Sequence, residues 1–141
     1  MRTPPVMLVV SSAVVLAAVV GGLVLLGSPS DERERRIDER RVSDLTAIAS
    51  ATDLYWTRHS ALPESLGELV AEPGVKIVTV DPASADTYDY RTLDSIRYEL
   101  CATFDQESGE ISTEPSRDLW AHGAGRHCFQ LDAEQLTRDE G

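Results

Sequence analysis

Two cysteines and two nearby histidines are the residues of this sequence best suited to chemistry. The chain has two cysteines, Cys101 and Cys128, and His122 and His127 lie close to the second one. Thiolate and imidazole groups are ligands that zinc prefers in proteins, so a Cys2His2 site is conceivable. The spacing H-x4-HC, however, matches none of the usual finger patterns. A zinc site therefore stays an alternative beside a disulfide and a pair of buried free thiols.

Each cysteine lies in a segment that the residue pattern predicts to be a β-strand. In residues 96–104 (IRYELCATF) apolar side chains alternate, so Cys101 points away from the face that they form. Residues 126–131 (RHCFQL) predict a last short strand around Cys128. If the strands are neighbours, a disulfide stabilises the fold by on the order of 3 to 4 kcal/mol in the chain-entropy model. We favour this bond, which implies an oxidising compartment.

Other patterns for catalysis or cofactor binding are weak or absent in the sequence. Asp81, Asp86 and Asp89 cluster near one turn, but they lack the Gly and the distal Glu of an EF-hand. No serine lies in a G-x-S-x-G elbow, and there is no Gly-rich phosphate loop or dinucleotide fingerprint. We therefore expect no enzyme, no cofactor and no metal.

Charge excludes nucleic acid as a partner. The 141-residue chain has a formal charge of −11, and the part after residue 30 holds 24 acidic residues against 12 basic ones, hence −12. Such a surface repels phosphate groups.

The first elements of the chain are an apolar segment and a charged one. Residues 6–26 carry no charge and are long enough for a helix that crosses a bilayer. A cleaved secretory signal and a buried soluble helix are the alternatives. We expect a membrane helix over 6–27, whose small-residue face either meets lipid or lets another helix approach closely. That face comprises Ala13, Ala17 and Gly21.

A long amphipathic helix is expected to follow a break at residues 27–30. It begins at Ser30 or Asp31, is solvated up to about Arg41, and has an apolar stripe from Val42 onward. Pro63 ends it at a corner and opens a short second helix that folds back over the aromatic residues. The expected core positions are Leu45, Ile48, Tyr55, Trp56, Leu62, Pro63, Leu66, Leu69, Tyr88 and Tyr90.

The rest of the chain predicts a small antiparallel sheet. Residues 75–80 (VKIVTV) alternate and are rich in β-branched side chains, which favours a further strand before the Asp81-Pro82 turn. The expected fold class is therefore α+β, with the long helix packed on the sheet. We divide the chain into a short segment (1–5), a membrane helix (6–27), a charged stalk (28–41), an α+β domain (42–132) and a disordered tail (133–141).

Residues from about Arg36 to Leu131 resemble the pilin-like domain of the major pseudopilin of type II secretion systems. The resemblance rests on RRVSDLTAIASATDLYW, on the corner from Leu62 to Leu69, and on Asp81-Pro82 followed by Tyr88-x-Tyr90. It implies a helix whose first half lies in the membrane and whose second half packs on the sheet. The usual leader, cleavage site and early glutamate of that family have no counterpart before Asp31.

The expected function is that of a membrane-anchored, non-catalytic, pilin-like envelope protein that acts through protein contacts. The expected partners are the bilayer, through residues 6–27, and other envelope or secretion-type membrane proteins. A processed subunit of a secretion pseudopilus and a small zinc-dependent enzyme or sensor are the alternatives. The arginines after the apolar run favour a cytoplasmic domain. The cysteines and the resemblance instead favour a single-pass protein of the bacterial inner membrane with its C-terminal domain in the periplasm.

Overall fold

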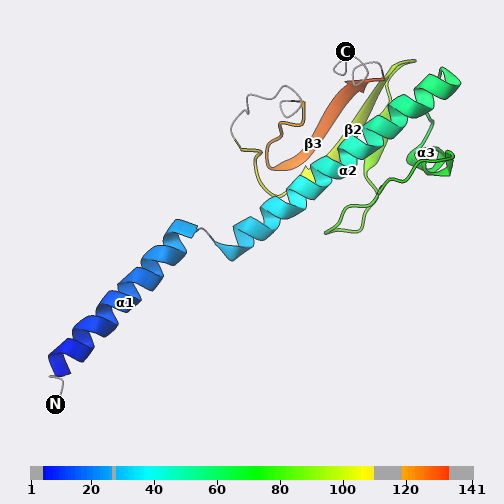
Figure 1. Ribbon diagram of the computed structural model, residues 1–141. Helices are drawn as coiled ribbons and strands as arrows, with labels where there is room; N and C mark the ends of the chain where they lie inside the picture. The colour runs from blue at the N-terminus through cyan, green and yellow to red at the C-terminus, as the bar shows by residue number, and fades with distance from the viewer. Residues whose placement is uncertain (1–4, 27, 110–118, 134–141) are drawn as a thin grey trace, which may run out of the picture. The chain divides into compact units, whose positions relative to one another are not determined.

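The computed structural model describes residues 5–26, 28–109 and 119–133. The chain divides into two compact units, Met1–Glu34 and Arg35–Gly141. Along the sequence the elements are α1 (Pro5–Leu26), α2 (Pro29–His59), α3 (Leu66–Ala71), β1 (Asp89–Thr92), β2 (Arg97–Phe104) and β3 (Gly125–Asp132) (Figure 1). Helices before a small antiparallel sheet give the expected α+β class.

The first unit contains α1, an apolar helix. By length and composition, one helix near the N-terminus of the described chain can cross a membrane. Its large apolar side chains are exposed, with Leu16 at 70% and Val24 at 76%. The helix ends at Leu26 and α2 begins at Pro29, slightly before the expected Ser30 or Asp31. Proline suits this first helical position because its missing N–H would have no partner in the helix.

The C-terminal end of α2 lies before the proline corner. After His59, Ser60 adopts a left-handed conformation with φ 54°, and its N–H donates to the carbonyl of Trp56 at 2.7 Å. A left-handed residue is a common helix stop. The short helix, expected to have Pro63 in its first turn, begins at Leu66 because Ser65 caps it: the Ser65 hydroxyl accepts from the Glu68 N–H at 3.2 Å.

The sheet has three described strands in the order β1-β2-β3, each antiparallel to the next. Both predicted strands around the cysteines are present. The prediction of a strand at 75–80 is wrong, because only an isolated bridge joins Val80 to Thr87 within the described chain. Val75 and Ile77 still pack against the core while Val78 is exposed. The alternation therefore reflects one-sided burial of an extended segment, without a neighbouring strand to complete a ladder.

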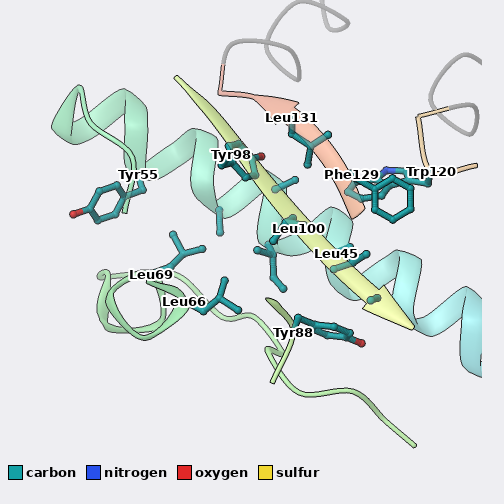
Figure 2. Close-up of a cluster of buried hydrophobic side chains, with 14 of the residues drawn as sticks. Leu45, Tyr55, Leu66, Leu69, Tyr88, Tyr98, Leu100, Trp120, Phe129 and Leu131 are labelled. Atoms are coloured by element: carbon teal, nitrogen blue, oxygen red, sulfur yellow. The ribbon is translucent and has the colours of Figure 1, made fainter. Parts of the chain in front are cut away.

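The core lies between α2, α3 and the inner face of the sheet (Figure 2). Alternate residues of β2 face inward, and Tyr98 and Leu100 have no exposed surface. From α2, Leu45 and Ile48 are equally buried. The remaining buried apolar residues of this cluster are Ala49, Ala51, Tyr55, Leu66, Leu69, Tyr88, Ala102, Phe104, Trp120, Phe129 and Leu131.

Three boundaries differ from the sequence interpretation. Asp38 and Arg41 are buried, so α2 packs against the domain one turn before Val42 and the charged stalk is shorter than expected. Ile96 precedes β2 and is 37% exposed rather than inside the sheet's apolar face. Ala133, assigned to a disordered tail, is buried, and its N–H donates to the carbonyl of Ile96 at 2.9 Å. The remainder of that tail, 134–141, lies outside the described residues.

Candidate functional site

A disulfide joins the neighbouring strands β2 and β3 of the sheet. Cys101 of β2 and Cys128 of β3 are directly opposite in the register and are bonded to each other. Because side chains alternate along a strand, the bond lies on the face away from the core. Two ion pairs share that face. Arg91 pairs with Glu99 at 2.8 Å, and Arg126 pairs with the carboxylate of Asp89 on β1. The bond links strands that the backbone ladder already aligns.

The two histidines lie on the opposite face from the cysteines. His127 is next to Cys128 on β3, so its ring turns inward, with its centroid 4.7 Å from that of Phe129. His122 is buried and stacks on Phe104 with the ring centroids 3.6 Å apart. Burial lowers the pKa of His122, which favours the neutral ring. The structure therefore does not bring together the Cys2His2 set.

One carboxylate lies close to the two sulfurs. Glu99, Cys101 and Cys128 place an oxygen and two sulfur atoms within 4.8 Å of one another. Zinc binding at cysteine requires thiolates, however, and both sulfurs are committed to the disulfide. In this oxidised form the group lacks thiolate ligands and fits no structural zinc site.

The most densely connected polar group, which we term the Arg41 cluster, comprises Arg41, Asp38, Asp81 and Asp105. The guanidinium of Arg41 donates from Nε to Asp81 at 2.6 Å, and from Nη1 to both Asp38 and Asp105 at 2.7 Å. Arg41 is 4% exposed, whereas the side chain of Asp105 is 42% exposed. The cluster thus joins α2 to the turn after residue 80 and to the loop after β2.

Backbone groups complete the Arg41 cluster. The carboxylate of Asp38 accepts from the N–H groups of Asp105 and Gln106 at 3.0 and 2.9 Å. That of Asp81 accepts from the N–H groups of Ala83 and Ser84 at 2.8 and 2.9 Å. Paired and hydrogen-bonded on all sides, these buried charges avoid the cost of desolvation without partners.

Titration behaviour in the Arg41 cluster follows from this pairing. Burial on its own would lower the pKa of Arg41, but its hydrogen bonds to Asp81, Asp105 and Asp38 raise it above the ordinary value. Burial would likewise raise the pKa of Asp81, but bonds from Arg41 and from two backbone N–H groups lower it. For Arg41 and Asp81 the ionised forms are therefore the stable ones.

A second polar group holds the proline corner. The Tyr55 hydroxyl donates to Glu68 at 2.5 Å, and the Tyr90 hydroxyl donates to the carbonyl of Pro63 at 2.9 Å. The hydrogen bond to Glu68, followed by burial, raises the pKa of Tyr55 to about 12. Leu62 packs on the core at partial exposure, and Pro63 is fully buried. Trp56 is half-buried and lies outside the main apolar cluster, unlike Tyr55.

Asp53 of α2 is a buried carboxylate without a hydrogen-bond partner among the described residues. It is 5% exposed, and no described group donates to either oxygen. Desolvation raises its pKa to about 7. Sequence reasoning missed both Asp53 and the Arg41 cluster, because it followed apolar residues. A usable signal existed for the cluster: Asp38 and Arg41 precede Leu45 by seven and four positions, so they share its helical face.

The small-residue face of α1 is exposed along its length. Ala13, Ala17 and Gly21 are all solvent-accessible, and a Cβ built on Gly21 meets no atom within 4 Å. The first unit has an apolar helix long enough to cross a membrane. In the second unit a disulfide and buried polar groups connect distant segments of the chain.

No family model, no curated protein and no solved structure matches this chain.

Proposed function

We propose that this chain is a membrane-anchored, non-catalytic envelope protein with a pilin-like α+β domain, acting through contacts with other membrane proteins. In this proposal α1 crosses the bacterial inner membrane once and the disulfide-closed domain faces the periplasm. The observation that carries the proposal is the pairing of a fully exposed apolar helix with a domain whose two cysteines form a disulfide.

The apolar helix supports the membrane part of the proposal. Side chains such as Val9, Val14 and Leu23 are more than half exposed. Exposed apolar surface costs about 25 cal/mol per Å² in water, so a helix of this kind requires lipid or a partner around it. Because a helix satisfies its own backbone hydrogen bonds, it suits the hydrocarbon layer.

The disulfide supports an oxidising side for the domain. Cytosolic thiols are kept reduced, whereas disulfides persist in the periplasm and outside the cell. This outweighs the five arginines between residues 33 and 41, which the positive-inside rule places in the cytoplasm. Arg41 in particular is bound by three carboxylates of the domain and is a structural residue.

In this proposal the domain's polar groups have an internal role, and the membrane helix supplies a surface for protein contacts. The Arg41 cluster and the proline corner bind segments of the same chain together. In the membrane, the face of Ala13, Ala17 and Gly21 is the place where a second helix approaches most closely.

The proposal is tested by topology and by lateral association in native membranes. We expect the chain to resist carbonate extraction, and its domain to be digested by protease in spheroplasts while intact cells protect it. A domain protected in spheroplasts contradicts the orientation, and extraction by carbonate contradicts the anchor. Recovery of a chain trimmed within residues 1–6 would instead favour the processed pseudopilin.

The helix contact has a matched pair of variants. Ala17→Leu fills the small-residue face, whereas Ala18→Leu adds the same side chain about 100° away around the helix. We expect the first variant to reduce cross-linked or native-gel complexes and the second to leave them unchanged. Equal behaviour of the two variants contradicts a contact through this face.

A further inference from the structure

Asp53 lies in the packed interface between α2 and the sheet. It is 5% exposed, and its neighbours one turn away on α2 carry no charge. These neighbours are Ala49, Ser50, Trp56 and Thr57. Because a helical residue meets those three and four positions away, α2 supplies no charged side chain to pair with Asp53.

The sheet also offers Asp53 no cation among the described groups. The phenol of Tyr98 on β2, which is fully buried, is close enough to interact with the charge of Asp53. Tyr90 of β1 and Asp132 of β3 act on the same phenol and are neutral or acidic. From α3, the carboxylate of Glu68 is held by Tyr55. Within the described ranges a negative charge on Asp53 is therefore unopposed.

We propose that Asp53 makes the packing of α2 on the sheet sensitive to pH: the C-terminal half of the helix is held firmly while this carboxyl is protonated and loosens when it ionises. An ionised carboxylate in an apolar interface without a donor is costly, and the interface relieves that cost by opening to water. The neutral acid fits because it carries no charge to desolvate.

The direction of the effect follows from linkage. Burial raises the pKa of Asp53 from 3.8 to about 7, so between these values the folded chain binds a proton that the unfolded chain has released. Each pH unit in that interval lowers the folding equilibrium constant about tenfold, and the loss is complete above the folded pKa. In the proposed location the domain meets the external pH, so a group that titrates near neutrality responds to the medium.

The test uses the full chain in detergent micelles or nanodiscs, with Asp53→Asn and a control, Asp86→Asn, which alters an exposed acid. We expect hydrogen exchange of the amides of residues 49–59 to accelerate about tenfold between pH 6 and pH 8, after correction for intrinsic rates. The acceleration should be absent in Asp53→Asn and unchanged in Asp86→Asn. An Asp53→Asn variant with the same pH response as the unaltered chain overturns the proposal.

A direct titration gives a second and independent readout. The side-chain carboxyl carbon of Asp53, followed by NMR, should titrate with a midpoint near neutral pH. A midpoint below about pH 5 would mean that the carboxylate is solvated or paired, and this would overturn the proposal even if Asp53→Asn failed to fold.

Discussion

Arg41 and Asp53 are charged residues buried on the same helix, three turns apart, with opposite surroundings. Arg41 is bonded to three carboxylates, and two of these also bind backbone N–H groups. Asp53 has no hydrogen-bond partner in the part of the chain that the structure describes. The paired charge of Arg41 therefore stabilises the packing of α2, whereas an unpaired charge on Asp53 destabilises it. Both residues are buried, so pairing decides the difference.

The largest loss of stability should come from removing the paired charge of Arg41. Arg41→Met keeps apolar volume but leaves Asp38 and Asp81 buried without a counter-charge, so we expect a loss of about 3 to 5 kcal/mol in the free energy of unfolding. Urea denaturation measures it, with Arg40→Met as the control because Arg40 is exposed on the same helix. A loss below about 1 kcal/mol would show that the Arg41 cluster does not stabilise the fold.

The disulfide provides a reference on the other face of the sheet, away from both charges. Replacing Cys101 and Cys128 together by serine should lower stability by about 3 kcal/mol, since the unfolded chain regains loop entropy. The pH response attributed to Asp53 should persist in this variant. If the double variant instead abolished that response, the response would belong to the sheet as a whole, and the contrast between the two charges would be lost.

The contributions of Asp53 and of the Arg41 cluster to stability should change in opposite directions with pH. Asp53→Asn should raise the free energy of unfolding by about 1 to 3 kcal/mol at pH 8, and the gain should disappear toward pH 4. Asp81, whose pKa is lowered mainly by its bonds from Arg41 against the effect of burial, acts oppositely. Its contribution is present above its ordinary pKa of 3.8 and is lost as pH falls below that value.

Urea denaturation of the unaltered chain, Asp53→Asn and Asp81→Asn across pH 3 to 8 checks the direction of both effects. A gain for Asp53→Asn that is equal at pH 4 and pH 8 would contradict an ionised, unpaired Asp53 in the native state. For Asp81→Asn, the stability deficit should shrink on the acid side, where the unaltered chain also loses the charge.

The smallest effect should come from a charge pair on the surface. Arg126 and Asp89 form an ion pair at 2.7 Å with side chains 61% and 65% exposed. Arg126→Gln should therefore change the free energy of unfolding by less than about 1 kcal/mol in urea. A loss comparable with that of Arg41→Met would mean that burial does not distinguish the two arginines.

Sequence patterns were sufficient where apolar alternation decides structure. The strands around Cys101 and Cys128 alternate cleanly, and both the strands and the bond are present. The same alternation was misleading at residues 75–80, because one-sided burial produces it without a partner strand. His127 illustrates a rule that could have been applied: adjacent strand residues face opposite sides, so it cannot join Cys128 at one metal.

The partners of the buried polar residues were the part that the sequence could not supply. Arg41 and Asp38 lie in a run of alternating charges, which by itself is typical of a solvated helix. Their partners Asp81 and Asp105 are 40 and 64 positions from Arg41, and only tertiary structure brings them together. The isolation of Asp53 is likewise a property of the packed interface, since helix periodicity places it at the flank of the apolar stripe.

The central claim is a full-length, membrane-anchored chain whose domain lies on an oxidising side, and its most direct test is intact mass spectrometry. The protein is extracted from its native membranes under thiol-blocking, non-reducing conditions and compared before and after reduction. We expect the mass of the uncleaved chain and a gain of two hydrogens on reduction, because Cys101 and Cys128 form a disulfide. A full-length chain whose two cysteines are already alkylated, with no change on reduction, would contradict it and place the domain in the cytoplasm.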